Sequence, residues 1–236
     1  MFANLEQLNI KHGVSTRLGG VSSAPYNYLN LGMKTGDDIA KVKHNRELFC
    51  QAVGVPFSSM VATQQVHGDI IHIVEKADAG RGAESAQTAI PDTDALITAE
   101  RGIPLMLFFA DCVPVLIYDK GKQVVAVSHA GWKGTVSKIA QKTVLAMQSR
   151  YGTAPADCVV AIGPSIGPDR YEVDEVVVSA LKDAFPWWEE VVRTRGNRWM
   201  LDLWQTNRRQ LIDIGVADSN IAISGVCTES NMNIFY

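Results

Sequence analysis

The chain has 236 residues, with 22 Lys and Arg against 25 Asp and Glu, and a formal net charge of −3. Because no basic cluster is present, nucleic acid is excluded as an expected partner. No apolar run is long enough to span a membrane, since Pro104, Asp111 and Pro114 interrupt the longest one. An apolar fraction of 47% is ordinary for a globular protein and supports a sizeable core.

The N-terminus and the cysteines indicate where the protein resides. The first residues, Met1-Phe2-Ala3-Asn4-Leu5-Glu6, lack the charged-then-apolar pattern of a signal peptide. The four cysteines are scattered, and in a chain that is not exported we expect them to be reduced thiols. The sequence therefore predicts a cytoplasmic protein.

The first third of the chain predicts a strand with turns over Lys11 to Gly36, followed by one helix, a short strand and a loop. Residues 15–22 are rich in Gly and Ser and indicate an extended loop. Asp37 or Asp38 can cap a helix that Gly54 and Pro56 end. Ile70 to Val74 predicts a short strand. Lys76 to Thr93, rich in Ala, Gly and Ser, predicts a mobile surface loop that would suit a lid.

The rest of the chain alternates apolar runs with amphipathic segments. Near-continuous apolarity predicts strands that are covered on both faces. We expect strands at Leu105–Ala110, Val113–Tyr118, Gln123–Ser128, Cys158–Ile162 and Asn220–Val226. We expect helices from Gly131 through Met147, over Val176–Leu181 and at Leu203–Ile214. No linker interrupts this alternation, so the residues alone favour one α/β-type domain over 1–236.

One Cys and two His stand at points where turns are expected. His67 precedes Gly68, Cys112 lies between two apolar runs, and His129 stands where a predicted strand gives way to a helix. We expect each of the three at the end of a strand. A thiolate and two imidazoles suit zinc or copper, and three protein ligands leave a fourth position for water or substrate. The separations are too long for a zinc finger, so the prediction rests on placement.

Other chemistries fit part of this pattern. Cys112 with one His is also the composition of a thiolate nucleophile and its base, and the sequence does not separate the two directly, although a second His favours metal. A blue-copper centre needs a Met after its Cys, and none lies between Cys112 and His129. A multicopper oxidase needs more imidazoles than the five His present.

Four further residues have a functional and an ordinary interpretation. Arg46, close to the apolar stripe of the first helix, either extends to solvent or points into a pocket as an anion clamp. Lys133 opens a helix, where an anion such as phosphate is favoured, although most helix starts bind only water. Asp111 either polarises a ligand or, more commonly, caps a turn, and Asp94 is similarly ambiguous.

At these segments the chain resembles the YfiH family, also known as laccase-domain or "polyphenol oxidase" proteins, peptidoglycan editing factors and metal-dependent purine nucleoside phosphorylases. The matching segments run in order along nearly the whole chain. They are Thr16–Ser22, Leu29–Gly32, Asn45-Arg46, Gln64–Gly68, Asp94–Thr98, Ala110–Pro114, His129–Gly134, Gly163–Gly167 and Asp202-Leu203.

The resemblance implies an α+β fold, with mixed β-sheets layered between helices in a single domain. It implies Zn²⁺ held by His67, Cys112 and His129, with copper as the other metal. It also implies phosphorolysis of adenosine, inosine, guanosine and methylthioadenosine, with adenosine deamination as a second activity. The expected partners are a purine nucleoside and phosphate, held by Arg46 and Lys133, with Cys112 at the reacting centre of a monomer or small homo-oligomer.

The resemblance leaves two alternative functions open, and the chain differs from the family pattern at two places. The family names also imply a hydrolase that edits peptidoglycan precursors, or a copper-dependent phenol oxidase, which the His count disfavours. Cys227-Thr228-Glu229 departs from the Cys-Thr-aromatic pattern of the family. Family members continue past the segment matching Cys227–Tyr236 with a Ser- and Arg-rich tail, so an anion-binding element is either absent or lies outside this sequence.

Overall fold

The fold is built on a six-stranded mixed sheet in the order β11-β7-β5-β6-β3-β2, seen in a computed structural model that describes residues 2–236. The long hairpin β5–β6 lies at its centre and is antiparallel, while the pairs β2–β3 and β7–β11 are parallel. The strands are β2 (Ile71–Ile73), β3 (Ala95–Thr98), β5 (Val113–Asp119), β6 (Val124–Ala130), β7 (Cys158–Ile162) and β11 (Ile221–Ile223).

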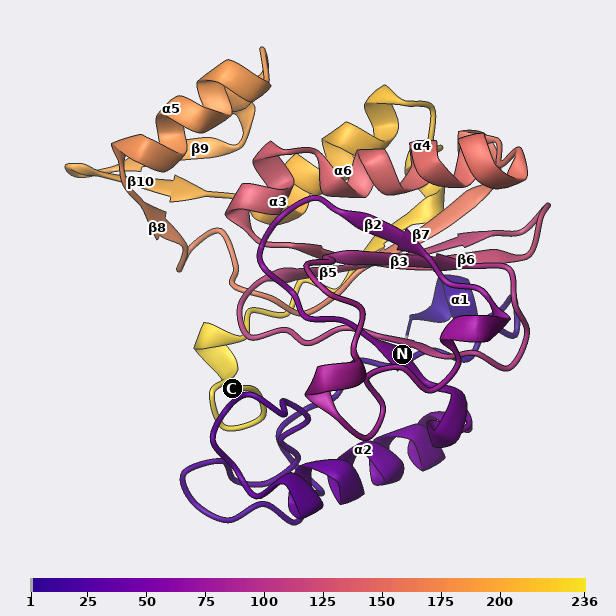
Figure 1. Ribbon diagram of the computed structural model, residues 1–236. Coiled ribbons are helices and arrows are strands. Elements are labelled where there is room, and N and C mark those ends of the chain that lie inside the picture. The colour runs from indigo at the N-terminus through magenta and orange to yellow at the C-terminus, as the bar shows by residue number, and fades with distance from the viewer. Residues whose placement is uncertain (1) are drawn as a thin grey trace.

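Helices cover one face of this sheet, and the main apolar core lies between the helices and the strands (Figure 1). Every second side chain of the central strands, such as Val113, Val115 and Ile117, points into this core, as the two-residue period of a strand requires. The covering helices are α3 (Trp132–Val136), α4 (Ile139–Tyr151) and α6 (Leu203–Asp213). Helix α5 (Glu175–Ala184) lies beside a three-stranded sheet of β8 (Glu172–Val173), β10 (Arg198–Leu201) and β9 (Val192–Arg195).

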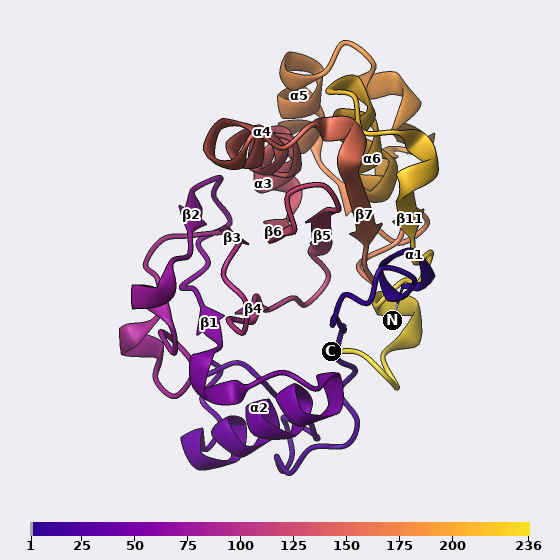
Figure 2. The same cartoon turned by 90° about the vertical axis from the view of Figure 1, so that its right-hand side faces the viewer.

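The opposite face meets the N-terminal part of the chain (Figure 2). Helix α2 (Ile39–Val53) begins where the Asp38 carboxylate accepts the Ala40 N–H and ends at Gly54, which is left-handed at φ 74°. The remaining elements are α1 (Ala3–Glu6) and the parallel pair β1 (Val61–Ala62) and β4 (Leu105–Met106). Single 3-10 turns lie at Phe57–Ser59, Lys76–Asp78, Ala86–Thr88, Pro155–Asp157, Trp188–Glu190, Asp218–Asn220 and Glu229–Asn231.

The structure therefore has the α+β class that the resemblance implied, and the strand–helix alternation read as α/β was misleading. The predicted helix after Gly131 is two helices, because Lys138 adopts a left-handed backbone at φ 64° between α3 and α4. The strand predicted over residues 105–110 is the two-residue β4.

The segment from residues 76 to 93 is not the free surface loop that its composition predicts. Ala83 and Ile90 are buried, and the guanidinium of Arg46 donates to the carbonyls of Gly82 and Ala83. Buried apolar side chains and a buried cation hold the segment against α2.

Among the helices of residues 2–236, none combines the length and the apolar composition of a membrane span.

Candidate metal centre

The structure brings together the three side chains that the sequence singled out. One ligand atom each of His67, Cys112 and His129 lies within 4.8 Å of the others. The β5–β6 register pairs Val113 with Ala130, so Cys112 comes beside the end of β6 across the hairpin. The rings of His67 and His129 meet edge to face, with centroids 4.7 Å apart.

The elements that present these side chains differ from those expected. Only His129 lies at the end of a strand, as the penultimate residue of β6. His67 lies in a loop after β1, and Cys112 precedes β5 rather than ending a strand. The backbone is left-handed at His67, with φ 61°, and at Asp111, with φ 72°, so both ligand-bearing turns are sharp.

Asp94 lies behind this cluster and is completely buried. Its carboxylate accepts a hydrogen bond from Nδ1 of His129 at 2.8 Å, and it also accepts the N–H groups of Val66, His67 and Gly68 at 2.8–3.1 Å. Burial by itself raises the pKa of Asp94, but the hydrogen bonds from His129, Gly68 and Val66 outweigh it and the net shift is downward. The ionised carboxylate fixes the tautomer of His129 so that Nε2 is free to bind a metal.

Close packing surrounds the sulfur of Cys112. A Cβ added to Gly131 would lie 2.8 Å from Sγ of Cys112, so only glycine fits there. Burial, followed by the charges of Asp111 and Asp94, raises the pKa of the Cys112 thiol to about 11. Burial, followed by the charge of His129, lowers the pKa of His67. A thiol with so high a pKa needs a neighbouring cation, such as a bound metal ion, to ionise at neutral pH.

The C-terminal part of the chain holds the turn that carries Cys112. The hydroxyl of Thr228 donates to the Asp111 carboxylate at 2.7 Å, and the N–H of Ile166 donates to the Asp111 carbonyl at 2.9 Å. Asp111 thus anchors its turn to segments that are distant in the sequence, a role that the sequence did not suggest.

The cluster lies where two cavities meet. The smaller one, of about 290 Å³, is lined by His67, Cys112, Trp132, Lys133 and Tyr171 among others, and burial raises the pKa of that tyrosine to about 12. The larger one, of about 1160 Å³, lies between the sheet and α2 and also reaches the three side chains.

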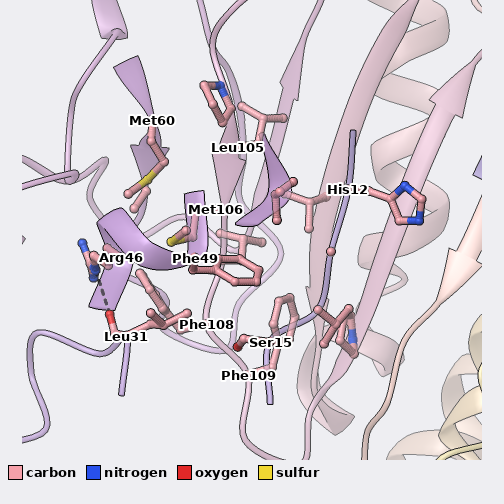
Figure 3. Close-up of a pocket in the computed structure, with 18 of the residues that line it drawn as sticks. His12, Ser15, Leu31, Arg46, Phe49, Met60, Leu105, Met106, Phe108 and Phe109 are labelled. Atoms are coloured by element: carbon pink, nitrogen blue, oxygen red, sulfur yellow. Dashed lines mark hydrogen bonds between the residues drawn. The ribbon is translucent and has the colours of Figure 1, made fainter. Parts of the chain in front are cut away.

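The two predicted anion-binding residues are placed very differently. Lys133 is exposed on α3 and lines the smaller cavity. Arg46 is buried, stacks on Phe108 and donates to the carbonyls of Leu31, Gly82 and Ala83, as Figure 3 shows for Leu31. These contacts give Arg46 an internal structural role. Lys133 lines the smaller cavity, and Arg46 does not.

Two imidazoles and a thiol at this separation fit zinc or copper by donor chemistry. The structure contains one such group of three or more His, Cys, Asp or Glu within residues 2–236. The other imidazoles have separate roles. His12 accepts the N–H of Phe2, His72 contacts Asp78, and His44 lies beside Glu47 on α2.

Comparisons with known proteins match nearly the whole chain. A family model described as multi-copper polyphenol oxidoreductase laccase matches residues 11–236. Purine nucleoside phosphorylase YlmD of Geobacillus stearothermophilus is 40% identical over 229 residues, which are 95% of this chain and 82% of that protein. Adenosine deaminase RL5, from an unknown prokaryotic organism, is 34% identical over 213 residues, covering 89% of this chain and 81% of that protein.

Solved structures agree with these matches. The crystal structure of the Bacillus licheniformis protein YfiH aligns with a TM-score of 0.91 at 34% identity, covering 94% of this chain and 84% of that one. The crystal structure of YlmD from Geobacillus stearothermophilus aligns with a TM-score of 0.90 at 40% identity, covering 94% and 83%.

Proposed function

We propose that this chain, which belongs to the multi-copper polyphenol oxidoreductase laccase family that includes YfiH and YlmD, is a zinc-dependent purine nucleoside enzyme. Its reactions are phosphorolysis of adenosine, inosine, guanosine and methylthioadenosine, and deamination of adenosine. Relatives from several bacteria carry the name purine nucleoside phosphorylase, and one is named adenosine deaminase.

The observation that carries the proposal is the open His67–Cys112–His129 cluster with Asp94 behind it. Three protein ligands leave room for one more group, which is typical of catalytic zinc sites. His67 is exposed and Cys112 is half-buried, so a substrate reaches the ligands from solvent. A purely structural site would instead be closed by a fourth protein ligand.

Zinc, when bound, supplies a Lewis acid that polarises a substrate atom or lowers the pKa of water. The residues of the chain supply the rest. Asp94 holds the imidazole of His129 in one orientation, and its ionised carboxylate keeps the proton on Nδ1. The exposed cation of Lys133 in the smaller cavity is available for phosphate.

Arg46 contributes to the proposed function indirectly, by holding segments of the chain in place. The three carbonyls to which it donates belong to Leu31, Gly82 and Ala83, and the first two of these residues line the larger cavity. We therefore assign phosphate to Lys133 and assign Arg46 the positioning of these segments.

Three competing functions have weaker support. A phenol oxidase with several coppers needs more imidazoles than one two-histidine cluster supplies. A bare Cys112 nucleophile is disfavoured because its pKa is raised to about 11. Editing of peptidoglycan precursors uses the same three ligands, and no contact within residues 2–236 selects a muropeptide. The free state of all four cysteines supports a cytoplasmic setting.

The first experiment combines elemental analysis with product detection on adenosine, with and without phosphate. We expect about one zinc per chain, adenine when phosphate is present, and inosine without it. The variant Cys112→Ala is expected to lose the zinc and both products. The variant Cys227→Ala, which changes a thiol outside the cluster, serves as the control. Full turnover in zinc-free Cys112→Ala would contradict the proposal, and zinc without nucleoside products would favour a cell-wall precursor.

A further inference from the structure

The smaller cavity combines two kinds of lining residue. The polar ones are His67, Asp111, Cys112 and Lys133. The apolar ones are Val66, Trp132, Ile166, Tyr171 and Leu203. Every lining residue lies between positions 66 and 203, so the cavity is built without the two ends of the sequence. A few polar groups in a mainly apolar lining are typical of a site that fixes the orientation of a small organic molecule.

The backbone of Tyr171 is held in place from both sides. Its N–H donates to the carbonyl of Gly167 at 3.0 Å, and its carbonyl accepts the N–H of Leu201 at 3.0 Å. The loop before it is also tied to the turn that precedes β5, because the N–H of Ile166 donates to the carbonyl of Asp111 at 2.9 Å. Tyr171 therefore has a set position relative to the candidate ligands.

Tyr171 brings a neutral hydroxyl into the neighbourhood of the ligand cluster. Burial, followed by the charges of Cys112, Asp174 and Asp111, raises the pKa of this phenol to about 12. Charges act appreciably only over short distances, so the hydroxyl lies close to the end of the cavity that holds Cys112. A neutral phenol both donates and accepts a hydrogen bond.

The purines of the proposed substrates differ in what they carry at the 6-position. Adenosine has an amino group there, which donates a hydrogen bond, whereas inosine and guanosine have an oxo group, which accepts one. Deamination takes place at the carbon that bears this substituent, so the 6-position has to reach a metal held by His67, Cys112 and His129. A hydroxyl near Cys112 is then within reach of the same substituent.

We propose that Tyr171 is a specificity-determining residue whose hydroxyl hydrogen-bonds to the 6-substituent of the purine, while Ile166 and Leu203 contact the base. This inference rests on the proposed nucleoside function and deepens it, because it states which residue recognises the base. The hydroxyl donates to an oxo group or accepts from an amino group, so one pocket takes adenosine, inosine and guanosine. A carboxylate, which only accepts, or an ammonium, which only donates, would select one kind of purine.

Tyr171→Phe tests this hydrogen bond, because it removes one oxygen and keeps the ring that lines the cavity. Calorimetry measures the binding of inosine to the zinc-loaded full-length chain in the absence of phosphate. We expect the dissociation constant of inosine to rise about three- to tenfold, the ordinary effect of losing one neutral hydrogen bond. Purine riboside, which has no 6-substituent, is expected to bind the native chain and the variant equally.

Kinetics provide a second readout with the same contrast. The kcat/KM for phosphorolysis of adenosine and inosine is expected to fall about three- to tenfold in Tyr171→Phe, with no change for purine riboside. Tyr151→Phe is the matched control, since it removes the hydroxyl of a half-buried tyrosine that lines neither cavity. Elemental analysis and circular dichroism verify that both variants keep their zinc and their fold.

The two ligands separate a hydrogen bond from a merely structural role. Equal weakening of inosine and purine riboside in Tyr171→Phe would show that the ring only shapes the cavity, and unchanged inosine binding would show that the hydroxyl makes no contact with the base. Either result overturns the inference while leaving the nucleoside function intact. A native chain that neither binds nor converts a nucleoside overturns the proposed function itself, and the inference with it.

Discussion

Asp94 and His129 are joined twice, once through their side chains and once through their main chains. The carboxylate of Asp94 accepts the Nδ1 proton of His129 at 2.8 Å, and the carbonyl of Asp94 accepts the main-chain N–H of His129 at 2.8 Å. The same carboxylate accepts the N–H of His67. One buried side chain therefore positions two of the three candidate ligands, the imidazole of His129 directly and His67 through its backbone.

Replacing Asp94 with Asn tests this arrangement. The amide keeps the shape of the carboxylate but loses its charge and part of its accepting capacity, so we expect zinc affinity to fall about 10–100-fold. The measurement is competition with a chromogenic chelator. Asp92→Asn, at an exposed position two residues away, is the control and is expected to bind zinc normally. Equal affinity in the two variants would show that Asp94 does not orient the ligands.

A methyl group at residue 131 is predicted to disturb the metal centre without unfolding the chain. The Cβ of Gly131→Ala would lie 2.8 Å from Sγ of Cys112, and the thiol must move to accommodate it. We expect loss of most bound zinc, measured by elemental analysis, with an unchanged far-ultraviolet circular dichroism spectrum. Gly68→Ala is the matched control, since its added Cβ would meet no atom closer than 3.5 Å. Normal zinc content in Gly131→Ala would contradict the packing argument.

Proton release accompanies metal binding. At pH 8 the Cys112 thiol, with its pKa raised to about 11, is protonated, while the pKa of His67 is lowered and its imidazole is already neutral. Since zinc binds the thiolate, we expect about one proton released per zinc. Calorimetry in buffers of different ionisation enthalpy measures this number. The variant Cys112→Ser should not release it, and release near zero in the native protein would place the sulfur outside the coordination.

Arg46→Ala separates the structural from the anion-binding interpretation of this residue. Removal of the guanidinium leaves the carbonyls of Leu31, Gly82 and Ala83 without their donor. Each hydrogen bond to a charged group is worth about 1.5–3 kcal/mol, so we expect a loss of at least about 3 kcal/mol in urea denaturation. Unchanged stability with a raised KM for phosphate would restore the anion clamp.

Acid conditions are predicted to destabilise the segment around Asp78. Burial alone raises the pKa of Asp78, but hydrogen bonds from His72, the Glu75 amide and Arg81 outweigh it and lower the pKa. Because the unfolded chain then binds the proton more tightly, Asp78 contributes stability above pH 3.8 that is lost as pH falls through its folded pKa. Asp78→Asn should therefore flatten the dependence of stability on pH between about 5 and 2. An identical profile in urea denaturation would contradict this.

Local signals in the sequence predicted several elements well. The cap at Asp38 and the left-handed Gly54 define α2, and the apolar run of β7 has the predicted bounds Cys158–Ile162. The three candidate ligands His67, Cys112 and His129 were singled out from their expected placement at turns and from the family resemblance, and the structure brings their ligand atoms within 4.8 Å of one another. Asp94 was left ambiguous, because its role depends on a partner 35 residues away that no local pattern reveals.

Other features could not be predicted because they too depend on contacts between residues far apart in the sequence. No Gly or Pro marks the break at Lys138, where a side chain from the distant helix α6, Gln210, donates to the carbonyl of Thr135 nearby. The segment from 76 to 93 has a loop-like composition, yet the buried cation of Arg46 holds it. The mixed direction of the strands likewise follows from long-range pairing rather than from the alternation of apolar runs.

The left-handed backbone at His67 limits which residues can occupy this position without strain. Histidine, asparagine and aspartate are the side chains that most often accept positive φ, whereas β-branched residues are strained in it. Asparagine, aspartate and glycine preserve the turn at residue 67. Of these, glycine offers no ligand atom, whereas aspartate offers a carboxylate oxygen that zinc also accepts, so the shape of the turn and the capacity to bind a metal can be changed separately at this position.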